Sequence, residues 1–196
     1  MPTMTAMKSI AFEQLVMTLV RLRPERDGWQ EHVCDAALGL VGEASSVSLW
    51  CETWEESAGP PSPEDAIAAL WAFEVYRAWA YYQLDLRPQF VRTGRVPYAS
   101  ARAAVADLAS HAGAVARLVR AWVFNGGWLD ARLEHALSGI EGARTALYQR
   151  LRLDECLVQA EAIRRMPARV TPPGVPHQAL HQMHRSDPLG GPVVTH

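Results

Sequence analysis

Histidine and cysteine are the side chains of this chain that could bind a transition metal. Near the end of the sequence, His177, His181 and His184 are spaced so that a helix would put all three imidazoles on one face. Proline and glycine surround them, however, so this tail is predicted to be extended rather than helical. The three cysteines are odd in number and form no C-x-x-C pair, which is typical of buried thiols rather than a disulfide or a zinc site.

The charge of the 196-residue chain argues against nucleic acid as a partner. Its formal net charge is -2 at pH 7, whereas a nucleic-acid-binding protein needs an excess of basic groups. The charge is unevenly distributed, because residues 1–86 are net acidic and residues 87–168 are net basic. We expect the two halves either to dock through complementary fields or to present a basic surface that faces phosphate.

No membrane partner is expected either. The sequence has no run of about 18 apolar residues, which is the length that a membrane span requires. Residues 1–8 lack the apolar core of a secretion signal. The sequence therefore predicts a cytoplasmic protein.

Apolar residues recur at helical spacing through the first half of the chain. The spacing predicts a helix over 10–22 and a long helix from 29 to about 57. A Gly-Pro-Pro break follows, and Ser62 with Pro63 has the composition of a helix start. The helix that follows ends near Leu86 and is apolar almost all round, so we expect it to be central.

Three more helices are predicted in the second half, over 100–124, 130–151 and 153–166. No segment shows the period-two alternation of a half-buried strand. The fold class is therefore all-α, a helical bundle of about six helices in a single domain over residues 1–170. Residues 171–196, rich in proline, glycine and histidine, are expected to form an extended tail.

A helix-loop-helix unit occurs twice, as pseudo-repeats at about 29–88 and 98–166. Aligning the sequence with itself pairs Glu43 with His111 in the first helix of the unit. The matches in the second helix are Glu74 with Glu141, Arg77 with Arg144, and Tyr81 with Tyr148. Because two helices cannot bury their own apolar faces, we expect the copies to pack as a four-helix, pseudo-twofold core.

These helices resemble those of the MazG-like all-α nucleoside triphosphate pyrophosphohydrolases, including the bacteriophage members. The resemblance rests on residues 36–44, Ala-Ala-Leu-Gly-Leu-Val-Gly-Glu-Ala, and in the second copy on 114–124 and 151–155. It covers about residues 10–165 as scattered matches. In that family an E-x-x-E pair and an E-x-x-D pair on neighbouring helices bind Mg²⁺, which polarises the phosphates and activates water to release pyrophosphate. The resemblance implies Mg²⁺ as the cofactor of an active protein and a nucleotide as its ligand.

Half of the family's metal ligands are missing from this chain. Glu43 matches the first acid of the family pattern, and Asp65 matches the third. Ser46 and Ala68 stand where the second and fourth acids would be. The resemblance therefore assigns catalysis and metal binding to Glu43 and Asp65 alone.

The second copy offers different chemistry at the same positions. His111 and His135 stand where the first and fourth acids would be, and two histidines on neighbouring helices are an alternative site for a softer metal. A basic wall for the phosphates of a nucleotide is expected from Arg117, Arg120 and Arg144.

The sequence thus favours a MazG-like pseudoenzyme with a degraded metal site. Such a protein would either bind a nucleotide without turnover or act as a helical scaffold or interaction protein. The alternative is an active Mg²⁺-dependent (d)NTP pyrophosphohydrolase that uses Glu43 and Asp65. A protein partner or a homo-oligomer is compatible with each function, and the fold alone does not decide among them.

Overall fold

The computed structural model describes residues 4–22, 29–54, 58–86, 88, 98–126 and 130–169. These residues form six α-helices and no strand. The helices are α1 (Met4–Leu22), α2 (Trp29–Thr53), α3 (Pro63–Gln83), α4 (Ala101–Asn125), α5 (Ala131–Leu151) and α6 (Glu155–Arg169). The predicted all-α class is confirmed, and none of these helices is long and apolar enough to cross a membrane. The predicted tail over 171–196 lies outside the described residues.

Local capping interactions set the starts of the three helices α3, α4 and α5. Their N-cap residues are Ser62, Ser100 and Asp130, and each side-chain oxygen accepts a hydrogen bond from a backbone N–H two or three residues further on. Pro63 occupies the first turn of α3. Helix α4 ends at Gly126, whose φ of 66° is a left-handed conformation that glycine adopts without strain.

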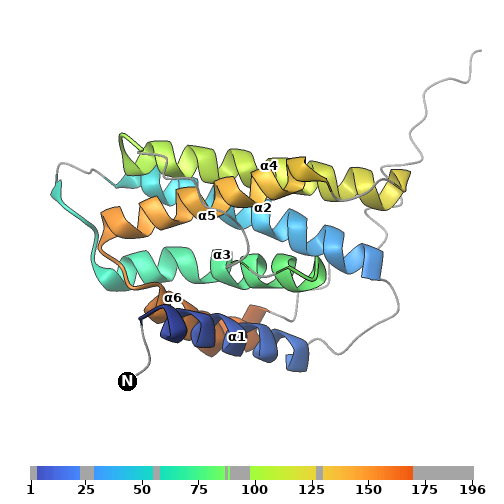
Figure 1. Cartoon of the computed structure of the whole chain (residues 1–196). Helices are drawn as coiled ribbons and strands as arrows, with labels where there is room; N and C mark the ends of the chain where they lie inside the picture. Colours follow the sequence, from blue (N-terminus) through green and yellow to red (C-terminus); the bar gives the residue numbers. More distant parts are fainter. Residues whose placement is uncertain are drawn as a thin grey trace, which may run out of the picture.

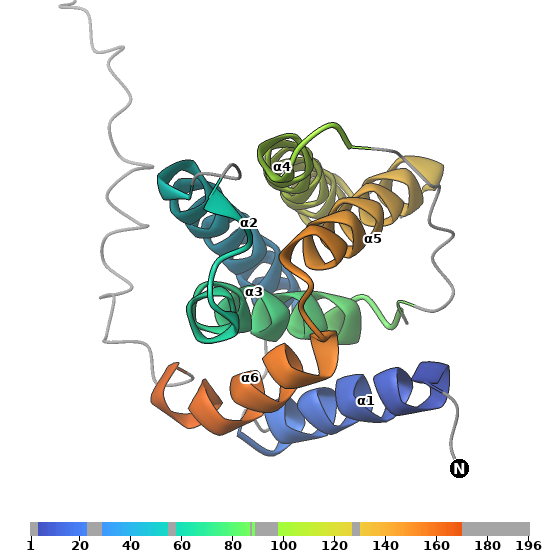
Figure 2. The ribbon, with the colours of Figure 1, turned by 90° about the vertical axis from the view of Figure 1, so that its left-hand side faces the viewer.

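Helices α2, α3, α4 and α5 form a four-helix core, and α1 and α6 lie together on the outer side of α3 (Figures 1 and 2). Within the core, α2 packs against α3 and α4, and α4 packs against α5. Helix α6 contacts both α3 and α1. Helix α3 is therefore covered on several sides, which agrees with its nearly uniform apolar sequence.

The buried apolar core is continuous across all six helices. Its largest fully buried side chains include Phe73 and Tyr81 of α3, Leu40 of α2, Leu108 of α4 and Ile140 of α5. The core holds the facing helices of the two units in fixed positions. Residues at the outer edges of these helices line surface grooves.

Candidate functional site

The first surface groove lies between the C-terminal half of α2 and the N-terminal half of α3, and we call it the α2–α3 groove. It has a volume of about 510 Å³. Glu43 of α2 and Asp65 of α3 both line it, as do Ser46 and Ala68. The two acids that the sequence singled out thus line the same groove from different helices.

The carboxylate of Asp65 already has a local role at the start of α3. Its Oδ2 accepts a hydrogen bond of 2.8 Å from the Ser62 hydroxyl, and its backbone N–H donates to the Ser62 oxygen at 3.1 Å. The capping bond satisfies one of the backbone N–H groups that have no partner within the helix, and the bond between the two side chains orients both of them. Asp65 would therefore hold the first turn of α3 in place whether or not it also binds a ligand.

Tryptophan side chains form much of the remaining wall. Trp50 of α2 and Trp54, which directly follows this helix, are stacked, with ring centroids 6.3 Å apart and planes inclined by 21°. The Trp54 indole N–H donates to the Gly59 carbonyl at 2.7 Å, which fixes the ring at the end of the groove. Trp71 lines the α3 side. These three rings are only partly buried, whereas Trp79 lies in the core.

The donor set of this groove limits what metal it could hold. Among the described residues, no group of three or more histidine, cysteine, aspartate or glutamate side chains is placed to hold a metal ion. Two carboxylates suit Mg²⁺ when phosphate oxygens and water complete its coordination shell. The residues of the groove therefore fit a magnesium ion that arrives with a phosphate ligand, and not a metal centre built by protein alone.

The second surface groove lies between α4 and α5, and we call it the α4–α5 groove. Its volume is about 440 Å³. His111 of α4 and His135 of α5 line it, with ring centroids 6.0 Å apart and planes inclined by 75°. Arg117 and Arg132 also contribute to its wall. The two histidines that the sequence proposed as an alternative metal site are thus neighbours across two helices.

The predicted basic wall is not formed, because its three arginines point to three different places. Arg117 lines the α4–α5 groove. Arg120 is exposed, and its guanidinium lies 5.8 Å from the centroid of the Phe124 ring. Arg144 is buried in the interior, where it donates to Glu74. No lysine or arginine is among the described residues that line the α2–α3 groove.

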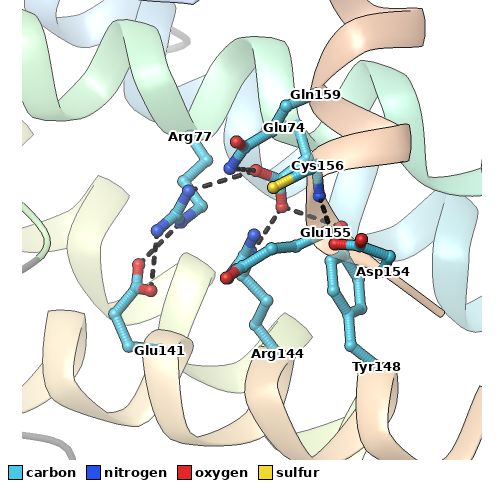
Figure 3. Close-up of polar contacts among 9 residues, drawn as sticks. All are labelled: Glu74, Arg77, Glu141, Arg144, Tyr148, Asp154, Glu155, Cys156 and Gln159. Atoms are coloured by element: carbon cyan, nitrogen blue, oxygen red, sulfur yellow. Dashed lines mark hydrogen bonds and ion pairs between the residues drawn. The ribbon is translucent and has the colours of Figure 1, made fainter. Parts of the chain in front are cut away.

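Arg144 belongs to a buried network of ion pairs that connects α3 with α5 (Figure 3). Arg77 of α3 makes two hydrogen bonds of 2.7 Å to the carboxylate of Glu141 on α5. In the opposite direction, Arg144 of α5 donates to Glu74 of α3. Each arginine therefore pairs with the glutamate of the other unit, which is the arrangement that the predicted repeat would produce.

Glu74 is the centre of this network. Its carboxylate also accepts hydrogen bonds from the Tyr148 hydroxyl at 2.8 Å and from the Gln159 amide at 3.3 Å, so α6 is tied to the same point. Burial alone would raise the pKa of Glu74, but the guanidinium groups of Arg144 and Arg77 outweigh this effect and lower the pKa to about 2. Burial, followed by the nearby Glu74 charge, raises the pKa of Tyr148 well above its usual value.

These glutamates and arginines match within the repeat, but their pairing was not predicted from the sequence. A signal was present, because Glu74 and Arg77 interrupt a helix that is otherwise apolar all round. Charged residues in such a position are buried only when they are paired. The network borders neither groove, and its ion pairs across α3 and α5 give it a structural role.

In comparisons with known proteins, no family model matches this chain, and no curated protein or solved structure is similar to it. The resemblance to the MazG-like pyrophosphohydrolases therefore stays a prediction that rests on the residues quoted above. What the described residues define is an all-α arrangement with the α2–α3 groove, the α4–α5 groove and a buried ion-pair network between α3 and α5.

Proposed function

We propose that the chain binds a nucleotide together with Mg²⁺ in the α2–α3 groove and turns it over poorly or not at all. It would be a catalytically impaired protein of the MazG-like type. The observation that supports this proposal is that Glu43 and Asp65, from two helices, line one groove with three tryptophans.

The tryptophan rings supply the part of the site that would recognise a base. Stacking of a base on an aromatic side chain contributes about 1–3 kcal/mol. The partly buried rings of Trp50, Trp54 and Trp71 offer such surfaces within the groove. Because every base has a π-face, this wall favours nucleotides without selecting one base.

The two carboxylates supply the part that would recognise the phosphates. Glu43 and Asp65 alone would repel a triphosphate. Magnesium held by these two side chains would supply the positive charge that the phosphate oxygens require. The carboxylates would orient the complex in the groove, and the capping bond from Ser62 would keep Asp65 in position.

The same geometry accounts for weak turnover. Ser46 and Ala68 line the groove at the positions where two further acids would strengthen a metal site. The Ser46 hydroxyl donates to the Gly42 carbonyl at 3.0 Å, so its proton is directed at the backbone of α2. With two carboxylates missing, the groove has fewer ligands to hold metal and to activate a water molecule.

Calorimetric titration of the chain with a panel of NTPs and dNTPs, with and without Mg²⁺, tests this proposal. We expect magnesium-dependent binding that weakens about tenfold or more in Glu43→Gln, because a charged metal ligand is lost. Glu64→Gln is the matched control. Glu64 is an exposed acid next to Asp65 in the first turn of α3, but it does not line the groove. Equal affinities in Glu43→Gln and the wild type would refute the proposal.

A parallel assay for pyrophosphate release separates binding from catalysis. Binding with little or no release supports the impaired protein proposed here. Magnesium-dependent release that disappears in Glu43→Gln would instead establish the active pyrophosphohydrolase. Absence of binding for every nucleotide would leave the helical scaffold or interaction protein as the better explanation of the fold.

A further inference from the structure

We propose that helix α6 takes part in base recognition at the α2–α3 groove, because its Arg165 is a positioning residue for the ring of Trp71. The inference rests on the proposed function, in which this ring is one of the surfaces that stack with a base. No residue of α6 is among the described residues that line the groove. Any effect of Arg165 on a bound base must therefore pass through Trp71.

Trp71 lies where the groove and α6 meet. It belongs to α3, which forms one wall of the groove, and α6 packs on the outer side of α3 (Figure 2). The guanidinium of Arg165 lies over the Trp71 ring, with its central carbon 5.7 Å from the ring centroid. A cation within about 6 Å of the centroid is attracted to the negative face of an indole. The Trp71 side chain thus lines the groove and is held by α6 at the same time.

Glu161 orients the guanidinium of Arg165. Its Oε1 accepts a hydrogen bond from Nε of Arg165, four residues further along α6. The same carboxylate accepts from Nε of Arg164 at 2.7 Å and from Nη2 of Arg164 at 2.6 Å. One acid therefore binds two neighbouring arginines.

The two arginines differ in where their side chains lie. Arg164 has 68% of its side chain exposed, whereas Arg165 has 39% exposed. Successive residues of a helix are rotated by about 100°, so Arg164 points to solvent while Arg165 reaches the Trp71 ring. A comparison of the two arginines therefore separates the contact with Trp71 from a general effect of positive charge on α6.

A ring that is already held binds a base better than a mobile ring. Affinity is lost when a ligand has to order a side chain as it binds. Arg165 holds the Trp71 ring before a base arrives. Removal of Arg165 should therefore weaken the contribution of the base to binding. It should leave the contribution of the phosphates, which Glu43 and Asp65 would bind through Mg²⁺.

Calorimetric titration with two probes, Mg²⁺-ATP and Mg²⁺-tripolyphosphate, tests the inference. Tripolyphosphate has the three phosphates of ATP without the base. We expect Arg165→Met to weaken ATP binding about fivefold and to leave tripolyphosphate binding unchanged. Arg165→Lys keeps a cation and should restore part of the loss. Arg164→Met is the matched control, because it removes the other partner of Glu161, and it should leave both affinities unchanged.

The two probes distinguish failure of this inference from failure of the proposed function. If the wild type binds neither probe, both are refuted. If it binds ATP no more tightly than tripolyphosphate, the phosphate part of the proposed function stands and base recognition through Trp71 is refuted. If it binds ATP more tightly, equal affinities of Arg165→Met and Arg164→Met for ATP would overturn the role of Arg165 alone.

A double-mutant cycle tests whether Arg165 acts through Trp71. Trp71→Leu removes the ring and should weaken ATP binding about tenfold or more. Arg165→Met added to Trp71→Leu should have no further effect, because no ring is left to hold. An equal effect of Arg165→Met with and without the ring would refute the positioning role. Circular dichroism checks that each variant is folded, and the comparison of Arg165→Met with Arg164→Met decides the question if Trp71→Leu does not fold.

Discussion

The α2–α3 groove and the α4–α5 groove occupy matching positions in the two helix-loop-helix units, yet their linings carry opposite charges. Glu43 of the first groove matches His111 of the second, and Asp65 matches Arg132. In the buried network between α3 and α5, by contrast, the two units carry the same residues. The matched residues there are identical, namely Glu74 with Glu141, Arg77 with Arg144, and Tyr81 with Tyr148.

The difference has a physical reason. Each buried arginine pairs with the glutamate of the other unit, so a change in one residue leaves a charge buried without its partner. The groove residues face solvent, where single substitutions have small effects on stability. The interior is therefore constrained by pairing, whereas the residues that line the grooves can differ.

Breaking one interior pair should have the largest effect. Arg77→Met removes the two hydrogen bonds to Glu141 and leaves that buried carboxylate without its main partner. We expect the free energy of unfolding to fall by about 3–5 kcal/mol. Urea denaturation followed by circular dichroism measures it. The double variant Arg77→Met with Glu141→Leu should lose less, and equal losses would show that the unpaired charge is not the cause.

The second largest effect should be a loss of folding stability at acid pH, where Glu74 of the interior network is protonated. The pKa of Glu74 is lowered from 4.5 to about 2 in the folded protein. Its contribution to stability is therefore complete above pH 4.5 and is lost as the pH falls from 4.5 towards 2. The contribution is on the order of 3 kcal/mol. Urea midpoints measured between pH 7 and pH 2 should decline more steeply in the wild type than in Glu74→Gln.

Glu161 is the control for this pH dependence. Its hydrogen bonds to Arg164 and Arg165 lower its pKa to about 2 as well, but this cluster lies at the surface of α6. Solvent screens such pairs, so Glu161→Gln should change the pH profile little. An equal effect of the Glu74 and Glu161 substitutions would contradict the special position of the interior network.

Two glycine substitutions compare the contact between α2 and α3 with the contact between α4 and α5. A Cβ on Gly39 would lie 2.1 Å from the Tyr76 ring, and one on Gly139 would lie 2.3 Å from the His111 ring. We expect Gly39→Ala to lower the free energy of unfolding by about 2 kcal/mol, because Tyr76 also packs against Trp79. Gly139→Ala should lose less, because His111 borders a groove into which its ring can turn. Thermal and urea unfolding would show whether the losses differ.

The smallest effect should be the same in both units. Ser62→Ala and Ser100→Ala each remove one capping bond, of 3.1 Å and 3.0 Å, from the start of α3 and α4. We expect each to reduce the free energy of unfolding by about 1 kcal/mol. A much larger loss for Ser62→Ala in the same denaturation assay would show that the bond from Ser62 to Asp65 adds stability beyond the cap.

Much of the fold could be predicted from local signals. Ser62 and Pro63 marked the start of α3, and the predicted starts of the next two helices, at residues 100 and 130, coincide with the N-caps Ser100 and Asp130, because a capping side chain bonds a backbone N–H within three residues. The start of α1 at Met4 lies before the predicted residue 10, where the apolar pattern begins. Helix α6 likewise continues to Arg169, past the predicted end at 166.

The candidate sites depended on the tertiary structure. Helical periodicity shows which residues of one helix share a face, but packing decides which neighbour that face meets. The sequence by itself determined the six-helix composition, the caps and the positions that match within the repeat. Only the packing of α2 on α3 brought Glu43 to the same groove as Asp65. The sequence predicted Arg144 in a basic wall, whereas the packing of the helices buries it as a partner of Glu74. That ion pair joins residues 70 positions apart in the chain, so local sequence signals could not predict it.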